Sequence, residues 1–191
     1  MEKLRIKDTE DQRRQQAYSE LMGSSRAKMQ IYSAYFSAQI NSNYNYLLSI
    51  VYAIAVIDYD SAHTVSEIKA ELIHEQTNSI YYKEHQIESG RVANYMPLVA
   101  EKSKDFFSTL GLIEVLFSNT HDLKDLIQRM ETSLGEFSLL TVELDEKSDA
   151  MVTKIMNQKM DSAEMRDKFV SEWVPEIDSL RGRNFEEYIK I

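Results

Sequence analysis

Cysteine is absent from this chain of 191 residues, and proline and glycine are scarce, at 2 and 5 residues. Without cysteine there is no disulfide framework, no thiolate metal site and no cysteine nucleophile. Sandwiches, barrels and propellers need proline and glycine for their many turns. The scarcity of both residues therefore excludes turn-rich β folds and favours long helices.

Charge is missing from one long segment. Residues 29–57 contain no Asp, Glu, Lys, Arg or His, although charged residues make up 28% of the chain. From Tyr44 to Ile57, 12 of 14 residues are apolar. A helix on the surface would carry a charged face, so this segment is predicted to be a central helix that other helices cover on most sides.

A membrane span is the alternative for this segment. A span needs about 20 mostly apolar residues, whereas nine Gln, Asn and Ser residues interrupt residues 29–57. Each buried amide in lipid would need an internal partner. We therefore favour a buried helix of a soluble bundle and do not expect the protein to associate with membranes.

Signatures of several functional classes are also lacking. The five glycines are too scattered for a phosphate-binding loop or a dinucleotide fingerprint, and no GxSxG motif is present. A net charge of −9 would repel a phosphate backbone, so nucleic acid is not an expected partner. The first residues lack the apolar core of a secretory signal, which makes the cytoplasm the expected location.

What the chain does contain is helical periodicity along almost its whole length. It predicts an all-α fold: one bundle domain, 1–191, of about five or six helices. Two helices are long, at about 25–57 and 121–159. Residues 1–24 are expected to form an N-terminal helix that is extended or peripheral, and residues 176–191 a C-terminal tail with a short helix.

Local signals set the expected helix ends. Thr64 and Glu67 have the spacing of a capping box, which begins a helix, and Gly90 is expected to end that helix. Pro97 suits the first turn of the next helix, and Pro175 should follow the end of another. Two further breaks are expected, at Gly23-Ser24-Ser25 and at a solvated turn, Arg181-Gly182-Arg183.

One pair of residues suggests a metal site. Glu71 and His74 form an ExxH motif, and Glu114 is an acid within an apolar helical stretch. Carboxylate-bridged metal bundles need a second ExxH and further glutamates from two other helices, which this chain does not offer. We therefore expect no bound metal or cofactor, and whether these three residues converge on a site stays open.

The candidate interaction residues lie on the uncharged helix, and they are Asn41, Asn43, Asn45, Tyr32, Tyr35 and Phe36. Consecutive asparagines of the three point about 200° apart, so in a central helix at least one amide should be buried and bonded to another helix or protomer. We expect their replacement by Leu to change the oligomeric state more than the stability. The three aromatic residues could instead line a ligand cavity.

Together these features predict a non-catalytic helical interaction or scaffold protein that works as a homo-oligomer, most simply a dimer. A helix of about 33 residues would extend about 50 Å and favours pairing with a partner subunit. The first alternative is a ligand- or metal-binding bundle with enzyme activity, using the tyrosine-lined cavity or a ferritin-like carboxylate and histidine site. A membrane-active helical protein is the second alternative.

Overall fold

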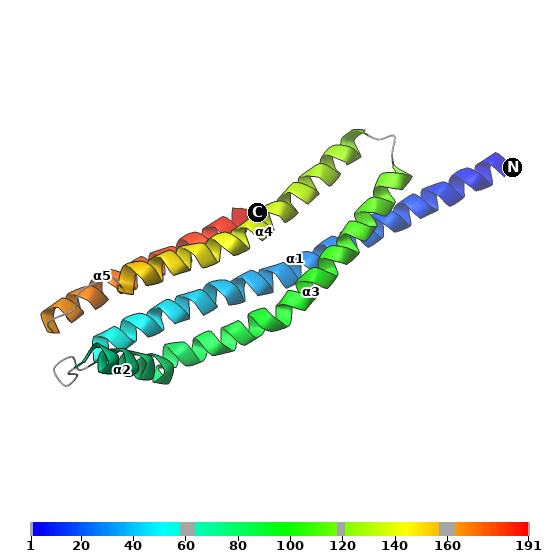
Figure 1. Ribbon diagram of the computed structural model, residues 1–191. Coiled ribbons are helices and arrows are strands. Elements are labelled where there is room, and N and C mark those ends of the chain that lie inside the picture. The colour runs from blue at the N-terminus through cyan, green and yellow to red at the C-terminus, as the bar shows by residue number, and fades with distance from the viewer. Residues whose placement is uncertain (1, 58–63, 118–120, 157–162, 191) are drawn as a thin grey trace. The chain divides into compact units, whose positions relative to one another are not determined.

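The computed structural model describes residues 2–57, 64–117, 121–156 and 163–190. Helices and the short links between them make up these residues, without a strand, so the all-α prediction is confirmed (Figure 1). The five helices are α1 Glu2–Val56, α2 Val65–Asn78, α3 Ile80–Leu116, α4 His121–Met156 and α5 Ala163–Lys190. The long helix expected at 25–57 is the second part of α1. The one expected at 121–159 is α4, and residues 157–159 lie outside the described part of the chain.

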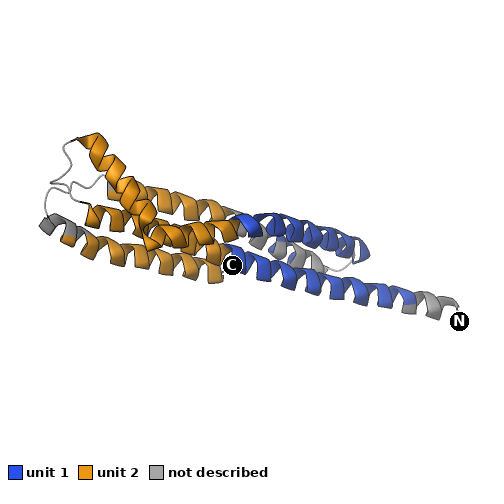
Figure 2. Cartoon of the chain, turned by 90° about the horizontal axis from the view of Figure 1, so that it is seen from below, with its two compact units in different colours: residues 1–35, 93–137 blue, residues 36–92, 138–191 orange. Residues whose placement is uncertain are grey.

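The chain packs as two compact units, each built from separate stretches of sequence (Figure 2). Unit 1 combines residues 1–35 with 93–137, and unit 2 combines residues 36–92 with 138–191. Unit 1 therefore contains parts of α1, α3 and α4. Unit 2 contains the other parts of these three helices together with α2 and α5.

Each unit has its own apolar core. The core of unit 1 consists of Ala17, Leu21, Phe106, Leu110 and Ile113, from α1 and α3. The larger core of unit 2 joins α1, α4 and α5, and it consists of Leu47, Leu48, Ile50, Val51, Ile54, Met151, Ile155, Trp173, Ile177 and Leu180. The uncharged part of α1 supplies half of the core residues that the structure describes in this unit.

The start of α2 agrees with its sequence signal. Thr64 Oγ1 accepts a hydrogen bond from the backbone N–H of Glu67 at 3.2 Å, and the Thr64 N–H donates to Glu67 Oε2 at 2.8 Å. The expected capping box is thus present. The helix does not continue to Gly90, however, because Ser79 is extended, with φ −64° and ψ 151°. Its hydroxyl donates to the Gln76 carbonyl and accepts from the Tyr82 N–H, which ends α2 and begins α3.

The breaks expected at glycine and proline are absent. Helix α1 continues through Gly23, α3 through Gly90 and Pro97, and α5 through Pro175 and Gly182. The predictions of a separate N-terminal helix, a turn at residues 181–183 and a short helix in a C-terminal tail were therefore wrong.

Exposure explains why the prolines are tolerated. An interior proline frees the carbonyl of the residue four positions earlier. Pro97 and Pro175 are exposed, as are Ala93 and Ser171, four positions before them. Water can therefore reach both carbonyls, and packing of the rest of each helix offsets the lost hydrogen bond.

Candidate functional site

The uncharged part of α1 is enclosed in unit 2. From residue 36 to residue 51 no side chain is exposed, and Phe36, Ile40, Leu47 and Ser49 are at most 1% accessible. The prediction of a central helix covered on most sides is confirmed for these residues. Such a helix carries its polar side chains into the interior, where each needs a hydrogen-bonding partner.

Several of these polar side chains bond to α4 and α5. Asn43 Nδ2 donates to Asp145 Oδ1 at 3.3 Å, and Gln39 Nε2 donates to the same oxygen at 3.2 Å. On the α5 side, Arg181 Nη2 donates to Asn41 Oδ1 at 2.8 Å. One turn of α1 therefore bonds to both neighbouring helices, which fixes their register within the unit.

Tyr44 extends this network along α5. Its hydroxyl donates to Asp178 Oδ1 at 2.8 Å, and the Arg181 guanidinium carbon lies 4.6 Å from the centre of its ring. Burial, followed by the hydrogen bond to Asp178, raises the pKa of Tyr44, so its hydroxyl stays protonated and keeps donating.

The three candidate asparagines have different surroundings. Asn41 and Asn43 make the interhelical hydrogen bonds that the sequence predicts, whereas Asn45 makes none to a described residue. All three are half-buried, and none is exposed. Their bonds lie within one chain, and a role in recognising a partner stays a prediction.

The three candidate aromatic residues are buried within their own units. The Tyr32 and Ser103 hydroxyl oxygens in unit 1 are 2.6 Å apart, and Tyr35 is 7% exposed. In unit 2, Phe36 stacks on Tyr188 with 5.5 Å between ring centres. Buried side chains of this kind stabilise a core, and a partner would reach them only if the helices separated.

The candidate metal ligands do not form a cluster in the described residues. His74 is exposed, and its ring nitrogens are 3.1 and 3.3 Å from Asn78 Nδ2. Glu71 is half-buried in unit 2, and Glu114 is exposed in unit 1. Across the part of the chain that the structure describes, no group of three His, Asp or Glu residues could hold a metal ion.

A buried lysine was missed by the sequence reasoning. Lys28 in unit 1 is 6% exposed, and its ammonium nitrogen lies 4.4 Å from the ring centre of Phe106 and 5.2 Å from that of Tyr32. It forms no ion pair with a described residue, and burial lowers its pKa from 10.5 to about 8. Helical spacing could have revealed it, because Lys28 follows Leu21 by seven residues on the same apolar face.

Lys28 should make stability depend on pH. Between pH 8 and pH 10.5 the unfolded chain keeps a proton on this amine that the folded chain has released. Stability should therefore rise as pH increases through this interval and be lowest below it. Because the aromatic rings favour the cation, we expect Lys28→Met to stabilise unit 1 by only about 1–2 kcal/mol near neutral pH, and by less in alkali.

Urea unfolding near neutral pH and in alkali measures this difference. Lys104→Met, at an exposed lysine of the same unit, is the matched control and should change little at either pH. A stability gain for Lys28→Met that is equal at both pH values would contradict the lowered pKa.

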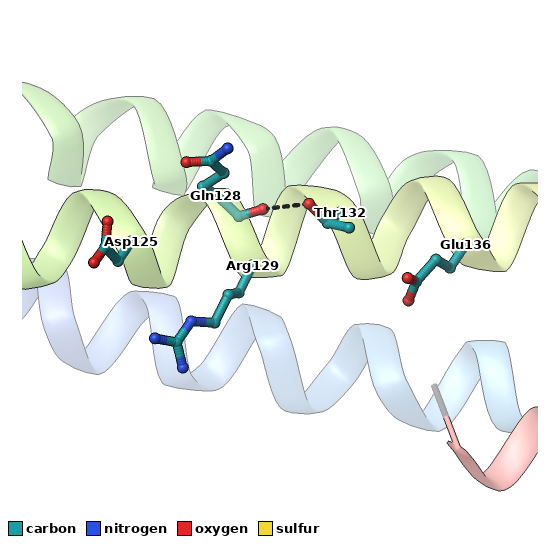
Figure 3. A pocket seen from close by; sticks show the side chains of 5 residues that line it. All are labelled: Asp125, Gln128, Arg129, Thr132 and Glu136. Atoms are coloured by element: carbon teal, nitrogen blue, oxygen red, sulfur yellow. Dashed lines mark hydrogen bonds between the residues drawn. The ribbon is translucent and has the colours of Figure 1, made fainter.

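A wide polar depression of about 490 Å³ lies in unit 1 (Figure 3). Its described lining comes from α4 alone, and consists of Asp125, Gln128, Arg129, Thr132 and Glu136. Gln128 and Arg129 point in opposite directions from the helix axis. The described side chains do not converge on one point, so they form no small-molecule site of the usual concave kind.

An exposed stripe on α1 is the second feature that sequence reasoning missed. Tyr18, Met22 and Met29 are 54%, 50% and 67% exposed in unit 1. They belong to a row with steps of three or four residues that carries no charge. This row is called the α1 stripe, and it consists of Gln15, Tyr18, Met22, Ser25, Met29 and Ser33.

Steps of three and four residues place side chains along the seam by which two helices pair in a coiled coil. The positions were visible in the sequence. Their exposure was not, because the same spacing also describes a helix face buried in its own chain.

Two broader findings complete the description. Within the described residues, no helix is long and apolar enough to cross a membrane. Comparison with known protein families, curated proteins and solved structures finds no match for this chain.

Proposed function

We propose that this protein is a non-catalytic helical scaffold that works as a homo-oligomer, most simply a dimer paired through the α1 stripe. The observation that carries the proposal is the row of uncharged side chains along α1 between Gln15 and Ser33, all exposed except the half-buried Ser25. Solvent-exposed helix faces in a chain of this composition usually carry charge. A cytoplasmic location is part of the proposal.

Pairing through this stripe is physically favourable. Two copies related by a twofold axis would bring tyrosine and methionine side chains together and bury apolar surface that is now in water. Methionine adapts to an irregular partner surface, and tyrosine is enriched at interfaces. Because the stripe has no charged residue, self-pairing creates no like-charge contact along the seam.

Light scattering after size-exclusion chromatography tests the proposal. At micromolar concentration the protein should elute with twice the chain mass of 22.2 kDa. Met22→Glu should weaken pairing at least tenfold, because it places two carboxylates in an apolar seam. Gln30→Glu adds the same charge at an exposed position on another face of α1 and should leave the dimer intact.

Cysteine cross-linking adds a geometric test, since the chain has no cysteine of its own. In a parallel pair, Met22→Cys should form a disulfide with its own copy on mild oxidation. In an antiparallel pair the cross-link should instead join Tyr18→Cys to Met29→Cys in a mixture of the two variants. A monomeric wild type, or a dimer that Met22→Glu leaves unchanged, would contradict the proposal.

A further inference from the structure

Unit 2 contains an apolar pocket beside α2, separate from the α1 stripe. It has a volume of about 300 Å³, at the lower end of the range for small-molecule sites. Helix α1 contributes Tyr46, Ile50 and Ala53 to its wall, and α4 contributes Val152. Ile50 and Ala53 are 6% and 1% exposed, so the floor of the pocket is the core of the unit itself.

The other wall is one face of α2. Lys69, Leu72, Ile73 and Gln76 line the pocket, with the spacing that places four side chains on one side of a helix. None of the residues of α2 is buried. Leu72 packs against the core while Ile73 is 61% exposed, so α2 closes the pocket only in part.

The polar groups of this pocket are few and specific. Among the described lining residues only Lys69 is charged, and its ammonium group has no ion pair or hydrogen bond with a described residue. Gln76 Nε2 is already engaged, because it donates to Ser49 Oγ at 3.1 Å. Lys69 is exposed, so its ammonium group stays in water beside the apolar wall of the pocket.

From this juxtaposition we propose that the pocket binds an aliphatic carboxylate of the fatty-acid class. The hydrocarbon tail lies against Ile50, Ala53 and Leu72, and the carboxylate pairs with Lys69 at the mouth. Transfer of the tail from water into the pocket is favourable, and the carboxylate accepts a charge-assisted hydrogen bond from Lys69. The inference does not depend on the proposed dimer, because the α1 stripe shares no residue with the pocket.

A series of ligands with matched tails tests the proposal by calorimetry. From butanoate to octanoate, each added methylene should tighten binding about threefold to fourfold until the pocket is filled. Octanoate should bind more tightly than octanol and octylammonium, which have the same tail. The last comparison is decisive, because a chain with a net charge of −9 would attract the cation if binding were non-specific.

Two lysine variants test whether the carboxylate of the ligand binds at Lys69. Lys69→Met keeps the aliphatic stem, and should weaken octanoate about threefold to tenfold while leaving octanol unchanged. Lys83→Met removes the same charge from an exposed position on α3 of the same unit, and should have no effect. Octanoate should also shift the methyl NMR signals of Ile50, Leu72 and Ile73.

Three results would overturn the proposal. One is the absence of octanoate binding at millimolar concentration. Another is equal affinity for octanoate and octylammonium. The third is an equal response to octanoate in Lys69→Met and Lys83→Met. None of these results depends on the oligomeric state, because the pocket shares no residue with the α1 stripe.

Discussion

Replacing Leu47 by Ala is expected to destabilise unit 2 by about 2–5 kcal/mol. Leu47 is 1% exposed and lies in the core where α1 meets α4 and α5. Removing three carbon atoms at such a site loses the favourable free energy of transferring them from water into the core. It also leaves a cavity that the packed helices fill only partly. For a chain of this size that is a large fraction of the total stability.

Chemical denaturation followed by circular dichroism measures this loss. Leu139→Ala is the matched control, since it removes the same atoms from a side chain in unit 2 that is 64% exposed. The control should change stability by less than about 0.5 kcal/mol. If Leu47→Ala cost no more than the control, the uncharged part of α1 would not be the core element described here.

The second large effect is expected at Arg181. Its guanidinium donates to Asn41 and lies over the rings of Tyr44 and Phe185, at 4.6 and 5.7 Å from their centres. Arg181→Met keeps the aliphatic stem but removes the charge, leaving the Asn41 oxygen without this donor. A charged hydrogen bond and a cation–π contact together predict a loss of about 2–4 kcal/mol.

Arg183 provides a control two residues away. It is exposed, and among the described residues its guanidinium donates only to Ser179 on the same helix, at 2.8 Å. Arg183→Met should therefore cost less than about 1 kcal/mol in the same denaturation experiment. Equal losses in the two variants would show that Arg181 acts as a solvated surface residue.

The sequence predicted composition-driven features well. The scarcity of glycine and proline indicated the all-α fold, and the missing charge in residues 29–57 indicated a covered helix. Both predictions rest on the composition of a long segment, which decides whether the segment forms a helix and whether that helix is covered. The Thr64–Glu67 cap was also predictable, because its two hydrogen bonds form within four residues of one another.

Helix ends governed by single residues were predicted poorly. An interior glycine costs about 1 kcal/mol and an interior proline about 3 kcal/mol, which packing elsewhere along a helix can offset. Gly90 and Pro97 are both exposed within α3, where neither leaves a buried group unpaired. Ser79 gave a weaker signal than either, yet α2 ends there.

Among the candidate site residues, too, the features set by nearby sequence were predicted and those set by distant residues were not. The spacing of the asparagines predicted that Asn41 and Asn43 would form hydrogen bonds with other helices. It did not predict their partners, which are Arg181 and Asp145. Those partners are 140 and 102 residues away, and only the packing of α4 and α5 against α1 brings them together. The burial of Lys28 likewise depends on Phe106, which belongs to a different helix.

The discontinuous make-up of the two units has a consequence during synthesis on the ribosome. Residues 36–56 of α1 are made early, whereas the α4 and α5 residues that cover them follow about a hundred residues later. At about 5–20 residues per second, the helix with no charge waits about 5–20 s for its cover. The asparagines and serines spaced along it shorten its longest apolar run, which lowers its tendency to aggregate in that interval. Two of these side chains, Asn41 and Asn43, thus help keep the nascent segment soluble before they bond to α5 and α4.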